Sequence, residues 1–95
     1  MNERARFLRQ GRIVEHFKRD FLSEYDKLNT LKYLYEVVGI AKHTETGEDM
    51  VIYRSLYRDE KGNFGLYVRP IDIFLSEVDR KKYPQSRRKY RFEFH

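Results

Sequence analysis

Residues 33–57 read YLYEVVGIAKHTETGEDMVIYRSLY, and this stretch decides the fold. Its two halves are rich in β-branched and aromatic residues, which favour strands. Between them lies the polar run 44–47, in which Gly47 supplies the positive φ that a short hairpin loop requires. The pattern therefore predicts two antiparallel strands, over 33–43 and 49–57, joined by a turn.

The segments before this hairpin predict one strand and one helix. Residues 12–18 alternate between two faces, which is typical of a strand. Residues 20–31 place apolar side chains at helical spacing, so we expect a short helix that ends near Asn29. Either Asp20 or Ser23 can cap its first turn.

The segments after the hairpin predict two more strands. Residues 64–69 follow a polar, glycine-containing turn and form the first of them. Pro70 suits the first position of a helical turn over 71–74. At the end of the chain, three aromatic residues alternate with charged ones, the pattern of a half-buried strand. These aromatic residues are Tyr90, Phe92 and Phe94.

About five short, bent strands with one helical turn before the last predict a mainly β fold, a small SH3-like barrel. Residues 20–31 are then a short helical insertion. A chain of 95 residues has room for one domain. We expect residues 1–10 to be an N-terminal extension and residues 11–95 to form the domain.

The composition excludes several classes of protein. Aromatic residues make up 16% of the chain, too many for a disordered protein. The chain has no cysteine, which excludes disulfides, thiolate zinc sites and a cysteine nucleophile. Its longest apolar stretch, residues 37–41, is too short to cross a membrane, so no membrane partner is expected. No apolar leader follows Met1, and we expect a cytoplasmic protein.

The positive charge lies at the two ends of the sequence. The net charge is +5. Residues 1–20 contain six basic and three acidic residues, and residues 80–95 contain seven basic residues and one acidic residue. The middle of the chain, with seven basic and eleven acidic residues, is mildly acidic. Because the last segment is patterned as a strand, its charge is expected on a folded edge.

Several motifs together resemble one family. HTETGE at 43–48 is followed by VIYRSLY at 51–57 and VRP at 68–70. With KYP at 82–84 and KYRFE at 89–93, they resemble the small bacterial family called domain of unknown function 1653. The resemblance covers about residues 11–94 and implies a compact SH3-like β domain, with no established reaction. Residues 20–31 are longer than the family's usual turn, and Tyr67 stands where a tryptophan is common.

Two arginines lie on predicted strands, where a charged side chain needs a partner. Arg54 lies between Ile52 and Leu56, which share its face and would normally be core, and Arg69 ends the next strand. Burying an unpaired guanidinium costs several kcal/mol, so one interpretation is an internal ion pair. The other is a groove for an anionic or planar ligand, in which arginine forks bind the anion and tyrosine rings stack. The ion-pair candidates are Glu36, Glu45 and Asp72, and the groove tyrosines are Tyr53, Tyr57 and Tyr67.

His43 and Glu45 are the candidates for catalysis or metal binding. Two residues apart, they can share a face as general base and orienting carboxylate, or bind a metal with His16 as third ligand. The alternative is that His43 closes the hairpin turn through backbone hydrogen bonds while Glu45 is solvated. No nucleophile elbow, phosphate loop or dinucleotide motif is present. We therefore expect a binding protein more than an enzyme, and no cofactor; an enzyme that uses His43 and Glu45 is the minor alternative.

A cluster of basic residues mixed with tyrosines occupies the C-terminal segment. Such a cluster can follow the backbone of single-stranded nucleic acid. It can also be a solvated edge that protects the last strand from aggregation. The basic residues are Arg80, Lys81, Lys82, Arg87, Arg88, Lys89 and Arg91.

These features favour a non-enzymatic binding module, with two hypotheses for its partner. One is nucleic acid, with RNA preferred, bound by the basic edge. The other is a protein or peptide bound in the tyrosine and arginine groove. The oligomeric state is left open. The candidate ligand-binding residues are His43, Glu45, Tyr53, Arg54, Tyr57, Tyr67 and Arg69.

Overall fold

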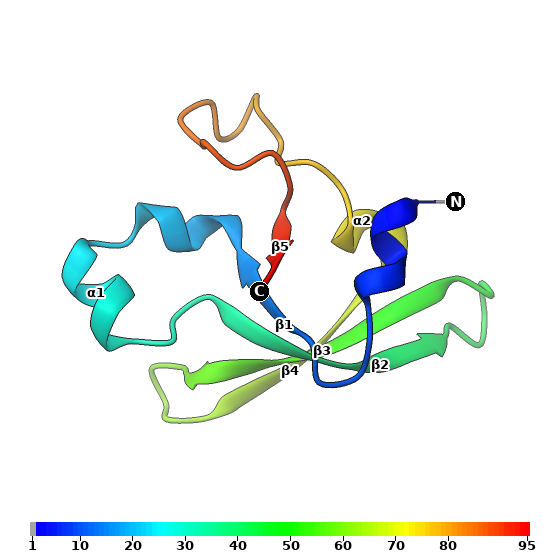
Figure 1. The fold of residues 1–95 in the computed structure, drawn as a ribbon. Coiled ribbons are helices and arrows are strands. Elements are labelled where there is room, and N and C mark those ends of the chain that lie inside the picture. Colours follow the sequence, from blue (N-terminus) through cyan, green and yellow to red (C-terminus); the bar gives the residue numbers. More distant parts are fainter. Residues whose placement is uncertain (1) are drawn as a thin grey trace.

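The protein is a five-stranded antiparallel sheet with short helices on one side of it (Figure 1). The computed structural model describes residues 2–95. The strands lie in the order β4-β3-β2-β1-β5. They are β1 (Ile13–His16), β2 (Leu34–Lys42), β3 (Asp49–Arg58), β4 (Phe64–Pro70) and β5 (Phe92–Phe94). The helices are the 3₁₀ helices η1 (Glu3–Phe7) and η2 (Phe17–Phe21) and the α-helices α1 (Glu24–Asn29) and α2 (Ile71–Phe74).

The predicted central hairpin is confirmed. β2 and β3 pair from Lys42 opposite Asp49 down to Tyr35 opposite Ser55. Gly47, at φ 75°, gives the turn its left-handed residue. The register shifts between Val37 and Gly39, a bulge that bends the hairpin.

The predicted helix is confirmed in its second half. Ser23 caps α1 by accepting a hydrogen bond from the Asp26 N–H, and the helix ends at Asn29. The preceding residues form the separate helix η2. The apolar stripe that predicted the helix is not buried, since Tyr25 is 72% and Leu28 83% exposed. Here the pattern identified the helix but not a packed face.

The sheet is open, so the predicted SH3-like barrel is not confirmed. β4 and β5 are the two edges of the sheet and do not pair with each other. β5 has only three residues and pairs with β1, while α2 lies between β4 and the long connection to β5 (Figure 1). Side chains, not hydrogen bonds, therefore fill the space between the two edges.

The core lies on the inner face of the sheet, under α2 and η1. Phe92 of β5 is stacked on Phe74 of α2, with ring centroids 4.1 Å apart and an interplanar angle of 6°. Tyr35 and Tyr53 meet the Phe92 ring edge to face. The valines at the centre of β1, β2 and β3 complete this core; they are Val14, Val37 and Val51.

The N-terminal segment packs against this core. Leu8 is buried with the core residues, and η1 supplies Arg4, whose guanidinium donates to the carbonyl oxygens of Leu75 and Phe92. The same guanidinium lies 3.6 Å from the centre of the Tyr90 ring. η1 lies within the stretch 1–10 that we expected to be an N-terminal extension, and Met1 lies outside the described residues.

Phe92→Ala is expected to lower the free energy of unfolding by about 3–5 kcal/mol, the range for a buried phenylalanine. The ring contacts four elements, so its removal leaves a cavity that no single element can close. Urea unfolding followed by tyrosine fluorescence measures the change. Phe64→Ala, at a 53% exposed position of β4, is the control and should stay within about 0.5 kcal/mol of wild type. Equal effects of the two variants would contradict this description of the core.

Candidate functional site

Two adjoining cavities open on the inner face of the sheet beside the core. One, of about 200 Å³, is walled mainly by aromatic rings. The other, of about 310 Å³, is lined mainly by charged and polar residues. His16, Lys18 and Arg69 line both, so the two form one cleft. The aromatic cavity also contacts Tyr33, Tyr35, Tyr53, Tyr67 and Phe92, and the polar cavity Phe17, Asp79, Lys82, Tyr83 and Arg91.

The aromatic cavity lies where the sheet fails to close. Tyr67 of β4 packs 5.5 Å from Tyr53 and 6.1 Å from Tyr35, measured between ring centroids. Its ring folds back over Gly65, where an added Cβ would come within 2.0 Å of the Tyr67 hydroxyl. Tyr53 and Tyr35 are buried, but Tyr67 is 43% exposed. Of these three tyrosines, Tyr67 therefore has the most accessible surface.

Four basic side chains line the cleft without forming an ion pair with any carboxylate of residues 2–95. They come from the start of η2, the end of β4 and the segment before β5, and are Lys18, Arg69, Lys82 and Arg91. Asp79 is the one carboxylate in the lining, and it accepts hydrogen bonds from the backbone N–H groups of Lys81 and Lys82. The cleft thus has an excess of positive charge.

Aromatic rings hold several of these cations in place. Lys18 and Lys82 lie on the Tyr83 ring, 5.4 Å and 5.6 Å from its centre, and Arg69 lies 5.7 Å from the centre of the Phe92 ring. Such contacts orient a cation without neutralising it. Burial and the nearby charge of Arg69 lower the pKa of Arg91, and both arginines line the polar cavity.

His16 lies where the two cavities meet and is held as a neutral hydrogen-bond donor. Its Nδ1 accepts a hydrogen bond from the Lys18 N–H, at 3.2 Å, which places the ring proton on Nε2. Burial, and then the charges of Arg69, Lys18 and Arg91, lower the pKa of the imidazole to about 3. A neutral histidine among cations can donate to an anion without adding to the repulsion.

Tyr33, on the wall of the aromatic cavity, has a strained backbone. Its φ is 68°, the left-handed region that costs a β-unbranched residue about 1 kcal/mol or more. The His16 N–H donates to its carbonyl oxygen at 2.9 Å, and its ring lies 5.9 Å from the His16 ring. The strain places an aromatic side chain beside His16.

The structure separates the two arginines of the predicted groove. Arg54 projects from the outer face of β3, because the core face of this strand carries Val51, Tyr53 and Ser55. The expectation that Arg54 lies on the core face is therefore wrong, while the ion pair with Glu36 is present, at 2.6 Å from Nε to Oε1. The outer face explains why this pair is exposed.

Of the predicted groove residues, the structure brings together Tyr53, Tyr67 and Arg69. Tyr57 is bonded to Tyr35, with 2.8 Å between the hydroxyl oxygens, and borders a separate open groove near α1. Burial raises the pKa of both hydroxyls, so both stay protonated. The ligand-binding role of all the predicted groove residues stays a prediction.

His43 and Glu45 lie in the β2–β3 turn. The His43 Nδ1 accepts hydrogen bonds from the N–H groups of Glu45 and Thr46, at 3.1 Å and 3.4 Å, and the Glu45 side chain is exposed. This is the turn-closing arrangement that the sequence offered as the alternative to a catalytic pair. Within residues 2–95, no group of three histidine, aspartate or glutamate side chains is arranged to hold a metal ion.

Apart from Arg88, the basic residues of the C-terminal segment divide into three groups. Arg80 donates to the carbonyls of Ser86 and Arg88, which holds the loop together. Lys82 and Arg91 line the cleft. The third group is exposed to solvent and consists of Lys81, Arg87 and Lys89.

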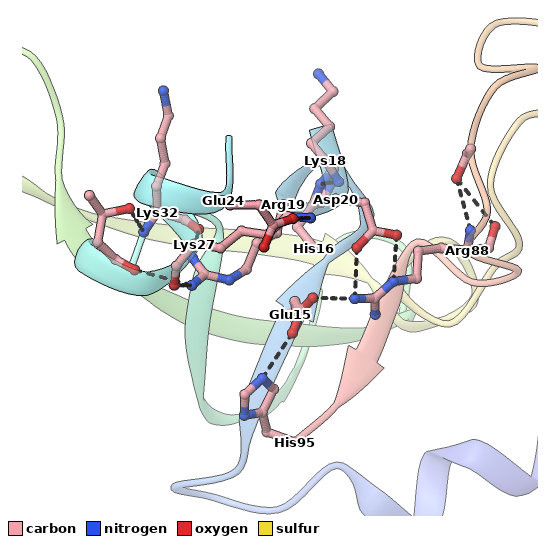
Figure 2. A network of polar contacts seen from close by, with 12 residues as sticks. Glu15, His16, Lys18, Arg19, Asp20, Glu24, Lys27, Lys32, Arg88 and His95 are labelled. Carbon is pink, nitrogen blue, oxygen red and sulfur yellow. Dashed lines mark hydrogen bonds and ion pairs between the residues drawn. The ribbon is translucent and has the colours of Figure 1, made fainter. Parts of the chain in front are cut away.

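Arg88 is the centre of an internal ion-pair network (Figure 2). Its Nε donates to Asp20 at 2.8 Å, and its Nη2 donates to Glu15 and Asp20. His95 bonds the other oxygen of Glu15 at 2.9 Å. The hydrogen bonds with Arg88 lower the pKa of Asp20. The Arg88 guanidinium is therefore paired with two carboxylates of the protein, whereas the Lys18 side chain extends away from the network (Figure 2).

Sequence reasoning assigned His16 only a minor role and missed Lys18 as a cleft residue. The available signal was the strand parity of residues 12–18, which puts His16 on the same face as the buried Val14. No sequence pattern predicted that Lys18 and Arg91 line the same cleft, because this depends on how η2 and β5 pack.

The family model described as "Protein of unknown function (DUF1653)" matches residues 12–94. The chain belongs to this family. The match starts after η1, so the DUF1653 region includes the sheet and the whole cleft, while Leu8 and Arg4 lie outside it. No curated protein and no solved structure matches the chain. In residues 2–95, no helix has the length and apolar character needed to span a membrane.

The low pKa of His16 predicts a loss of stability in mild acid. The folded-state pKa, about 3, lies below the unfolded value of 6.5, so the folded protein binds fewer protons. Stability is therefore full above about pH 6.5 and falls by about 1.4 kcal/mol per pH unit as the pH drops toward 3.

Urea unfolding at pH 4.5 to 7 measures this slope. His16→Asn keeps a side-chain acceptor for the Lys18 N–H but does not titrate. The stability of this variant should therefore depend less on pH, by about 1.4 kcal/mol per pH unit, the effect of one proton. An unchanged slope in the variant would contradict the assignment to His16.

Proposed function

We propose that this DUF1653 protein is a non-enzymatic module that binds single-stranded RNA in the cleft. The observation that supports this most directly is the group of four cations around aromatic walls, none paired with a carboxylate of residues 2–95. Proteins that bind single strands combine basic side chains for the phosphates with aromatic rings for the bases.

The shape of the cleft favours a single strand over a duplex. Its aromatic surface lies in a cavity of about 200 Å³, not on a flat face. Bases in a duplex are stacked and paired, so their flat faces cannot enter such a cavity, whereas an unpaired base can turn outward.

Further basic side chains extend the surface beyond the cleft. Lys81, Arg87 and Lys89 are exposed on the same C-terminal segment that brings Lys82 and Arg91 to the cleft. They can neutralise phosphates on either side of the bound nucleotide, which adds affinity without sequence preference.

A protein partner is the second candidate function, supported by the exposed face of β4. This strand is an edge of the sheet, and three apolar side chains project from its outer face. An extended peptide can add to such an edge through backbone hydrogen bonds. The three side chains are Phe64, Leu66 and Val68.

Fluorescence anisotropy with a labelled single-stranded RNA tests the first function. We expect micromolar binding at 50 mM salt and a steep decrease in affinity as salt rises. Lys18→Gln and Arg69→Gln should each weaken binding about tenfold and reduce the salt slope by about one, because each removes one phosphate contact.

Arg54→Gln is the matched control, since it removes an arginine from the opposite face of the sheet. It should bind like wild type within about twofold. No binding at 50 mM salt, or an equal loss in Arg54→Gln and Arg69→Gln, would rule out RNA binding by the cleft.

A further inference from the structure

Resting on the proposed function, we propose that the cleft holds one unpaired nucleotide in two subsites. The phosphate binds in the polar cavity, among Lys18, Arg69 and Arg91. The base enters the aromatic cavity and stacks on Tyr67. The shared chemistry is a nucleoside monophosphate unit, either as a free molecule or within a strand.

The polar cavity has the charge arrangement that a phosphate requires. Arg69, Arg91 and Lys18 all line this cavity, so three positive charges repel one another there. A phosphate between them would replace this repulsion by attraction. Each guanidinium has two parallel N–H groups that match two phosphate oxygens, and the arginines are half-buried and thus less screened by salt.

The aromatic cavity has the shape and surface that a base requires. Its volume of about 200 Å³ suits one planar ring system and is below the range of complete drug-sized ligands. Tyr35 and Tyr53 are covered by other rings, whereas Tyr67 retains an exposed surface. The strained Tyr33 lies in the same lining and gives the cavity a second aromatic wall.

His16 links the two subsites. It is the only histidine that lines the cleft, and its Nε2–H is the group left to donate once Nδ1 has bonded the Lys18 N–H. Placed between a phosphate and a base, it would donate to an oxygen of the ligand at the sugar–phosphate junction. It therefore favours a ligand that has both parts over phosphate alone.

The test compares four probes by isothermal titration calorimetry and anisotropy. They are inorganic phosphate, adenosine 5′-monophosphate, a six-nucleotide single-stranded RNA, and the same oligonucleotide with abasic sites. We expect the monophosphate to bind at least tenfold more tightly than inorganic phosphate. The abasic strand should bind about 5- to 100-fold more weakly than the intact one, the range for one stacked base.

Two variants separate the base subsite from the phosphate subsite. Tyr67→Leu removes the open ring, and Gly65→Ala displaces it by placing a Cβ where the Tyr67 hydroxyl lies. Both should abolish the difference between intact and abasic strands while leaving inorganic phosphate binding unchanged. Tyr25→Leu, at an exposed position of α1, is the matched control and should preserve the difference.

Each outcome decides one of the two proposals. Intact and abasic strands that bind equally well overturn the base subsite but leave RNA binding by charge in place. A free monophosphate that binds as tightly as the strand supports the two subsites and overturns RNA as the partner. Binding of none of the probes at 50 mM salt overturns both. If Tyr67→Leu proves unfolded by circular dichroism, Gly65→Ala decides the base subsite alone.

Discussion

The fold depends on the position of the Phe92 ring. Phe92 comes from a three-residue strand, yet its side chain contacts α2 through Phe74, β2 through Tyr35, β3 through Tyr53 and β1 through His16. No backbone pairing joins β5 to β4, so this ring does what a closing strand pair would do in a barrel. Because β5 is so short, its hydrogen bonds to β1 would be marginal alone, and the buried ring holds it in place. Arg91 precedes this strand and is held in addition by backbone hydrogen bonds to Ser76 and Phe17.

The open side of the sheet is also the reason that a cleft exists. In a closed barrel, β4 and β5 would pair and their side chains would fill the interior. Here Tyr67 and Arg69 of β4 face Phe92 across a cavity. The arginine is then half-buried beside an aromatic ring, and it forms no ion pair with a carboxylate of residues 2–95. Such an arrangement lowers stability compared with a paired arginine, as the strained Tyr33 also does. Both features lie in the lining of the aromatic cavity.

The sequence predicted the elements well and their assembly only in part. The hairpin, the Ser23 cap and the α2 turn followed from local patterns, because turns and caps are decided by a few neighbouring residues. Barrel closure depends on contacts between distant edges, which no local pattern reveals. Arg54 shows the same limit: apolar neighbours at 52 and 56 suggested a core face, but the buried face of β3 is the one with Tyr53. Both faces of that strand are largely apolar, so alternation could not distinguish them.

The charge of the C-terminal segment shows why a count of residues is a poor guide to a binding surface. Arg88 is the most strongly bonded of the seven basic residues, with two carboxylates on its guanidinium (Figure 2). The Arg80 guanidinium donates hydrogen bonds to loop carbonyl oxygens. Fewer basic side chains are then left for a ligand. Two of them, Lys82 and Arg91, line the cleft together with Lys18 and Arg69, which are distant in sequence. Four cations converging on a half-buried cleft attract an anion more strongly than seven spread over a solvated edge, because salt screens buried charges less. The neutral His16 fits this arrangement, since an additional positive charge there would oppose folding and a bound anion would be needed to stabilise it.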